Sequence, residues 1–184
     1  MDLATAKAKV WQILDEYSSG GTVVEDDDIK LKLNNFFDIA QKQLAQKKRI
    51  VKMHTLVIDN TGANEYTEYA MPADFYALKQ VWADYEPISN GVWRNKKLLL
   101  PTDENRKIEI EYYAYPSDIT TDTADSYAFE IDKDAQECMP YWVASNCVIT
   151  DLVVDYQKIL GIYNQMLNNL FDTDPKPAIK VVQL

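Results

Sequence analysis

The sequence predicts an α+β protein, a helical bundle into which a small antiparallel β-sheet is inserted. Two observations predict this class. Near both ends of the chain, large apolar residues recur at steps of three, four or seven, which is the spacing of one helix face. From residue 50 to residue 115 the period changes to two, which is typical of strands. We expect two N-terminal helices in residues 1–50, the β subdomain in 51–116, a linker in 117–133, one long C-terminal helix in 134–172 and an extended tail in 173–184.

The length and net charge of the chain limit the number of domains and the kinds of partner that we expect. A chain of 184 residues is long enough to bury a core as one domain. Its net charge of −10 argues against wrapping by nucleic acid and against docking on an anionic membrane, because both surfaces are negative. No run is long and apolar enough to span a bilayer, and the N-terminus lacks a signal-peptide pattern. We expect a cytosolic protein with no membrane partner.

The first two helices carry clear end signals. Between Asp2 and Tyr17 the apolar positions share one face, Asp2 can cap the start, and a pair of glycines follows the end. The second helix follows the acidic cluster Glu25 to Asp28 and closes on the basic run Lys47 to Arg49, so both ends complement the helix dipole. Its buried face should contain Leu33, Phe36 or Phe37, Ala40 and Leu44.

The acidic cluster matches a metal-binding loop only in part. A calcium loop of the EF-hand type that starts at Asp26 needs glycine at its sixth position and glutamate at its twelfth. Leu31 and Phe37 stand there instead. We therefore interpret the cluster as a solvated cap of the second helix and predict no metal site. The same interpretation applies to the later carboxylates Asp118, Asp122 and Asp125.

The alternating region should form four or five strands of one sheet. Residues 51–58 and 65–70 look like an antiparallel pair joined by a polar loop. Met71 to Leu78 looks like a short helical turn with proline near its start, and Val81 to Tyr85 like extended chain. Strands should follow the turn signal Asn90-Gly91. In the last strand, alternation predicts one shared face for Ile108, Ile110, Tyr112 and Ala114.

The longest helical pattern runs from Asp134 to Phe171. Its apolar positions cover more than the stripe of roughly 100° that a surface helix presents, so it should be covered on more than one side. Asp134 can cap its start, and Pro140 predicts a bend or a late start. Gly161 weakens its middle by about 1 kcal/mol relative to alanine and would let a neighbouring backbone come close.

The residues offer little for catalysis. Cys138 and Cys147 lie nine residues apart on the last predicted helix, too far for a disulfide, and we interpret them as buried structural thiols. The single histidine, His54, lies in a strand pattern and cannot form a site of two or more histidines. No glycine-rich phosphate loop or nucleophile motif is present. We predict that the chain is not an enzyme and holds no cofactor.

Three elements of the chain, taken together, form a recognisable pattern. The first is the run Pro72-Ala73-Asp74-Phe75 with Leu78 and Val81 at three-residue steps. The second is the strand that ends in Tyr112-Tyr113-Ala114-Tyr115-Pro116, and the third is the closing helix with Ala144 and Thr150-Asp151. Together with the N-terminal helical pair, these elements resemble the head-to-tail adaptor (connector) proteins of tailed bacteriophages. The resemblance covers most of the chain, from about residue 20 to residue 171.

The resemblance implies a structural protein of the virion neck, assembled in the host cytoplasm. Such proteins form a ring of about twelve copies under the portal, extend the DNA channel without sequence-specific DNA binding, and give tail or nozzle proteins a docking surface. The proline-containing tail cannot continue the helix and is too short for an isolated strand, so it would be disordered or donated to another chain. Our hypothesis is that portal or subunit docking uses Pro175, Pro177, Ile179, Val181, Val182 and Leu184.

Two other functions stay open. Aromatic residues on a small sheet could form a stacking platform, which favours a carbohydrate-binding or glycan-degrading module. The candidate rings are Trp82, Trp93, Tyr112, Tyr113 and Tyr115. The alternative for these rings is burial in the core and in subunit contacts, where tyrosine and tryptophan are enriched. A soluble host regulatory protein without an assembly role is the third possibility.

Overall fold

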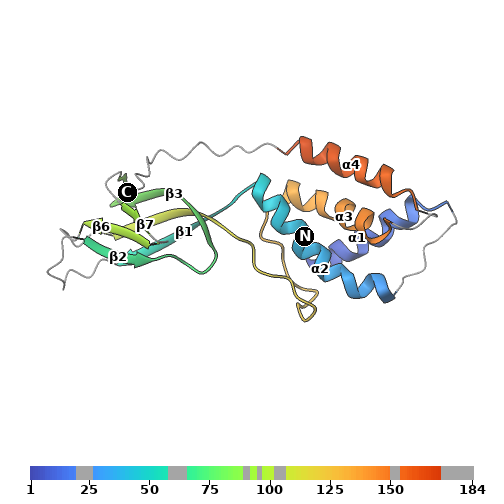
Figure 1. Cartoon of the computed structure of the whole chain (residues 1–184), viewed down its shortest axis with the longest axis horizontal. Helices are drawn as coiled ribbons and strands as arrows, with labels where there is room; N and C mark the ends of the chain where they lie inside the picture. Colours follow the sequence, from blue (N-terminus) through green and yellow to red (C-terminus); the bar gives the residue numbers. More distant parts are fainter. Residues whose placement is uncertain are drawn as a thin grey trace. The chain divides into compact units, whose positions relative to one another are not determined.

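The computed structural model describes residues 1–19, 27–57, 66–88, 92–94, 97–101, 107–149 and 154–170. The chain divides into two compact units. The helical unit combines Met1–Ile50 with Pro116–Asp172, and the sheet unit contains Val51–Tyr115. Figure 1 shows the helices and strands of each unit along the colour scale of the sequence.

The described helices all belong to the helical unit. They are α1 (Leu3–Glu16), α2 (Asp27–Lys47), α3 (Lys133–Cys147) and α4 (Tyr156–Asn168). The first two confirm the predicted pair, and Asp2 caps α1 by accepting a bond of 2.8 Å from the amide of Thr5. The two glycines expected to end α1 lie outside the described residues. The predicted apolar faces are buried: Leu3, Ala6, Val10, Ile13 and Leu14 in α1, and Leu33, Phe37, Ala40 and Leu44 in α2.

The prediction of one C-terminal helix from Asp134 to Phe171 is wrong. α3 begins at Lys133 with Asp132 as its cap and ends at Cys147, and α4 begins anew after the cap Asp155. Pro140 lies inside α3, so the predicted late start does not occur. The run from Val148 to Val154 is rich in β-branched residues, which weakens helix formation there and allows contacts with another segment to break the helix.

The break has a specific conformation where it meets α1. Val154 forms an antiparallel bridge with Ser18, and the amide of Asp155 donates to the carbonyl of Tyr17 at 3.2 Å. Asp155 then accepts a bond of 3.1 Å from the amide of Lys158, which starts α4. An extended residue and a new cap therefore replace the helical turns that the apolar spacing predicted.

The described strands form two antiparallel sheets rather than the one predicted. The four-stranded sheet has the order β1-β7-β3-β4, and the three-stranded sheet has the order β2-β6-β5. The bounds are β1 (Ile50–Val57), β2 (Tyr66–Ala70), β3 (Phe75–Ala83), β4 (Glu86–Pro87), β5 (Val92–Arg94), β6 (Lys97–Pro101) and β7 (Lys107–Ala114). The predicted pairing of the first two strands is also wrong, because β2 pairs with β6. Alternation reveals the faces of a strand but does not identify its partner.

The predicted arrangement of the sheet is corrected as well. It is not an insertion within one bundle: the strands lie in the chain between the N-terminal helices α1 and α2 and the C-terminal helices α3 and α4. The fold is thus α+β, as predicted, with four described helices in place of three. The turn signal Asn90-Gly91 lies outside the described residues.

Strand β3 explains why Met71 to Leu78 looked helical. Its pairing with β7 places Phe75, Leu78 and Val81 opposite Ala114, Tyr112 and Ile110, with register shifts after Phe75 and after Leu78. Each shift adds one residue to β3, which is the effect of a β-bulge. Three-residue steps along β3 therefore match two-residue steps along β7. The predicted helical turn is confirmed only as one turn, in which the amide of Phe75 donates to the carbonyl of Pro72 at 3.0 Å; from Phe75 on the chain is a strand, and the period of three comes from the bulges.

A tight hairpin joins β3 to β4. Ala83 pairs with Glu86, so Asp84 and Tyr85 form a two-residue loop. Both loop residues have positive φ, 51° and 72°, the conformation of a type I′ turn, which asparagine and glycine prefer. The sequence signal for this turn was missed because neither residue is glycine or asparagine, and Val81 to Tyr85 was predicted to be extended throughout.

Candidate functional site

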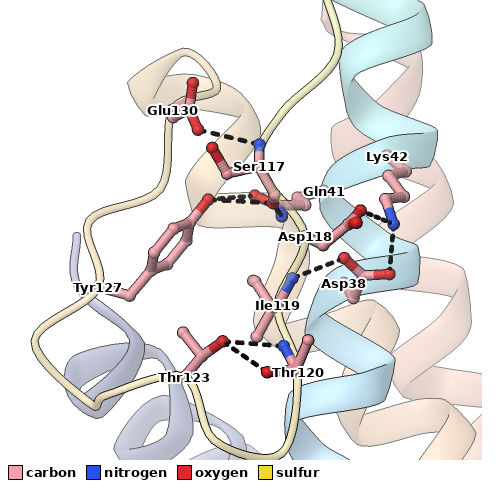
Figure 2. Close-up of polar contacts among 10 residues, drawn as sticks. All are labelled: Asp38, Gln41, Lys42, Ser117, Asp118, Ile119, Thr120, Thr123, Tyr127 and Glu130. Atoms are coloured by element: carbon pink, nitrogen blue, oxygen red, sulfur yellow. Dashed lines mark hydrogen bonds and ion pairs between the residues drawn. The ribbon is translucent and has the colours of Figure 1, made fainter. Parts of the chain in front are cut away.

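An irregular segment, residues 116–130, lies along α2, and we call it the strap (Figure 2). Three side chains spaced by four and three residues on α2 hold its backbone. The bonds, of 2.6 to 2.9 Å, are Gln41 Nε2 to the carbonyl of Ser117, the amide of Ile119 to Asp38 Oδ1, and Asn34 Nδ2 to the carbonyl of Thr120. The strap runs antiparallel to the helix. One helix face therefore binds the backbone of a segment that lacks regular secondary structure.

Charged side chains add to this attachment. Lys42 Nζ lies 2.6 Å from Asp118 Oδ1 on the strap and 2.7 Å from Asp38 Oδ2 on its own helix (Figure 2). The hydrogen bond with Asp118, followed by that with Asp38, raises the pKa of the Lys42 ammonium group. Asp125 pairs with Lys7 of α1 at 2.7 Å. Asp118 and Asp125 are exposed, but each forms an ion pair rather than serving only as a solvated cap.

The strap also contributes to the core. Ile119 and Phe129 are buried, and the ring of Phe129 lies 5.7 Å from that of Phe37 on α2. Tyr127 donates to Gln41 Oε1 at 3.3 Å, and Glu130 accepts a bond of 2.9 Å from the amide of Ser117 (Figure 2). The predicted linker is therefore a packed part of the helical unit.

The side chains of the strap site bind backbone and one another, and none is a nucleophile beside a base. Burial raises the pKa of the Cys138 thiol to about 11 and that of Cys147 to about 12, so both stay protonated at neutral pH. Both are free, as predicted, but only Cys138 is buried as expected, and Cys147 is half-buried. His54 lies half-buried in β1. Among the described residues, no group of three or more His, Cys, Asp or Glu could hold a metal ion.

A second polar cluster lies in the sheet unit, at the start of β3. Asp74 accepts bonds from Lys52 Nζ of β1 at 2.8 Å and from the hydroxyl of Tyr112 of β7 at 3.0 Å. Burial by itself would raise the pKa of the Asp74 carboxyl, but the bonds from Lys52 and then Tyr112 outweigh it and lower that pKa. The carbonyl of Asp74 accepts the amide of Tyr115 at 2.7 Å. Asp74 therefore ties three strands together.

The predicted stacking platform is not formed as expected. Tyr112 is 4% exposed and Tyr113 2%, so neither ring can stack on a ligand. Their burial favours the alternative that these rings fill the core. Tyr115 is exposed and packs edge to face against Tyr76, with ring centroids 4.9 Å apart. Trp82 is half-buried, and the side chain of Trp93 lies outside the described ones.

Large apolar side chains are exposed in both units. Leu31 on α2 is 74% exposed, Ile149 after α3 57%, and Met53 on β1 55%. In α4 only Ile159 and Tyr163 are buried, and a further set is half-buried: Tyr156, Leu160, Ile162, Met166 and Leu167. Among the described residues, no helix is sufficiently long and apolar to traverse a lipid bilayer.

The six residues predicted to dock onto a portal or a neighbouring subunit lie outside the described residues. They are Pro175, Pro177, Ile179, Val181, Val182 and Leu184. The strap site and the Asp74 cluster were both missed from the sequence. The available signal for the first was the spacing of Asn34, Asp38 and Gln41, which places polar groups beside the apolar face of α2.

Comparison with known proteins does not assign a family. No model of a known protein family matches this sequence, and a search of curated proteins finds no similar one.

Proposed function

We propose that this chain is a head-to-tail adaptor of a tailed bacteriophage, which forms a ring between portal and tail and extends the DNA channel. One observation carries the proposal. The two strand motifs on which the resemblance rests are neighbours in the fold: β3 pairs with β7, and Asp74 of the first motif bonds Tyr112 and Tyr115 of the second. Phe75 stacks on Tyr112 with ring centroids 5.7 Å apart. The motifs therefore belong to one structural module.

The surface properties support an assembly role. A ring subunit needs apolar side chains available to its neighbours, and Leu31, Met53 and Ile149 are large apolar residues with more than half of their surface exposed. The net charge of −10 also suits a conduit, because a negative lining repels DNA and does not retain it. Channel-facing residues of the assembled ring should be predominantly acidic.

The first prediction concerns the tail. A chain that ends at Asp172 should keep its fold, because the described helices and strands end at Asn168, but it should bind the portal ring encoded by the same genome at least tenfold more weakly. In the proposed mode the tail adds a strand to another chain, and the truncated protein lacks the backbone hydrogen bonds of that strand. Electron microscopy of the mixed proteins and a binding titration measure the effect.

The matched control is the full-length chain with Ile179 and Val181 changed to serine, which keeps the length but removes two apolar side chains. Its binding should fall between that of the wild type and that of the truncated chain. Equal docking by all three proteins would refute the role of the tail. If the wild type forms no ring with or without the portal, the adaptor proposal itself is wrong.

A further inference from the structure

The outer face of α4 is not explained by the fold of the helical unit. Its exposed residues are Gln157, Lys158, Gly161, Asn164, Gln165 and Asn168. Of the four described helices, α4 is the one without Asp or Glu, although the chain contains 29 acidic residues. In an acidic protein, a helix that keeps its exposed surface free of carboxylates has a surface suited to contact.

Gly161 lies at the centre of this face. Gln157, Lys158, Asn164 and Gln165 are its neighbours three and four residues away, so they surround it on the helix surface. A Cβ atom placed on Gly161 would meet no heavy atom within 4 Å outside the adjacent backbone. Glycine weakens a helix interior relative to alanine, and no group among the described residues requires it here. Close approach by another backbone is one physical use of a glycine at such a position.

The rest of α4 leaves this face open. α4 packs on α3, and its buried residues are Ile159 and Tyr163, one turn apart. Gly161 is exposed, and its position on the helix is turned away from these two residues by more than a quarter of a turn. Lys158, at one edge of this face, is an exception, because its Nζ lies 4.9 Å from the centroid of the Tyr17 ring. Apart from this contact, α4 attaches to the described part of the chain by one side and presents the other.

We infer that a second copy of this chain packs against α4 around Gly161. Charge selects a copy as the occupant: two molecules that each carry −10 repel least where a surface has few carboxylates, and α4 has none after its cap Asp155. Amide chemistry agrees, because Gln157, Asn164 and Gln165 each donate and accept hydrogen bonds and can pair with polar groups of either kind. A strongly basic partner would instead be drawn to the acidic faces of the other helices.

This inference deepens the proposed function, since it names the helix through which neighbouring subunits would touch. It rests on the proposed function only for the number of copies. Self-association through α4 is a property of the chain by itself and needs neither portal nor tail.

The experiment compares two double variants of the full chain with the same added charge. Gln157→Glu with Gln165→Glu places carboxylates on the α4 face, and Gln12→Glu with Gln43→Glu places them on exposed positions of α1 and α2. Sedimentation equilibrium gives the dissociation constant for self-association of each, and circular dichroism checks the fold. We expect the α4 variant to raise this constant at least tenfold, and the control to stay within about twofold of the wild type.

Equal constants for the two variants would overturn the inference, as would a wild type that stays monomeric up to about 1 mM. Association that depends on α4 but stops at a dimer would support this inference and contradict the proposed ring. Rings that form equally well from both variants would support the proposed function and overturn the inference.

Discussion

Helices α3 and α4 arise from one continuous apolar pattern, yet the fold buries them very differently. α3 contacts α1, α2 and α4, and eight of its 15 residues are buried. α4 has two buried residues among 13. Apolar spacing therefore indicates which face of a helix is turned inward, whereas the number of packed neighbours decides how much of it is covered. The helix at the centre of the unit is α3.

The contrast also separates two ways of covering a helix. Other helices cover α3, while α2 is partly covered by the strap, whose backbone is bonded by Asn34, Asp38 and Gln41. A strap that lacks regular secondary structure needs partners for its own peptide groups, and these polar side chains supply them. The following substitutions test both differences.

The largest effect should come from truncating a methionine in α3. Met139 is fully buried and Met166 of α4 is half-buried. Met139→Ala should lower the free energy of unfolding by about 2–5 kcal/mol, because it leaves a cavity, whereas Met166→Ala should cost about 1 kcal/mol. Urea denaturation of the two variants measures the difference. Equal losses would show that α4 is as deeply packed as α3.

A smaller loss is expected when the strap is released from α2. Gln41→Ala should lower the free energy of unfolding by about 1–3 kcal/mol, because this fully buried side chain donates the hydrogen bond of 2.6 Å to the carbonyl of Ser117 on the strap. Gln43→Ala, two residues along on the exposed side, should stay within about 0.5 kcal/mol of the wild type. If both variants match the wild type, the hydrogen bond from Gln41 contributes nothing measurable to the attachment of the strap.

The smallest effect concerns the start of α3 and depends on pH. The hydrogen bond from Lys48 lowers the pKa of the Asp132 carboxyl in the folded state. Its contribution to stability is therefore fully present above the unfolded value of about 3.9 and is lost as the pH falls through the folded pKa. Asp132→Asn should reduce the fall in Tm between about pH 5 and pH 3. Lys48→Met should do the same, and an unchanged slope in both variants would contradict the assignment.

The elements with strong local signals could be predicted from the sequence. Asp2 caps α1 as expected, α2 starts among aspartates, and Ile108, Ile110 and Tyr112 are buried on β7. In each case the deciding interaction lies within a few residues, so the local pattern and the fold agree.

The errors arose where distant partners decide the conformation. Val154 and Asp155 leave the helix because Ser18 and Tyr17 bond them, which no local spacing reveals. The two bulges of β3 imitate a helical period because β7 lies opposite. The strap was predicted to be a simple linker, since its partners Asn34 and Asp38 precede it by more than 80 residues. Asp155, a good capping residue within the apolar stripe, was a signal in the sequence that a new helix begins there.

The way α1 is held at both ends has a consequence for biosynthesis. Its first residues bond Asp125 and Tyr127, and its last turn is joined by Val154 and Asp155. During translation α1 emerges from the ribosome first. Its partner residues are synthesised only after all the strands. The apolar side chains of α1 and α2 therefore remain accessible to chaperones during most of translation. In this interval the sheet unit can complete its own strand pairings.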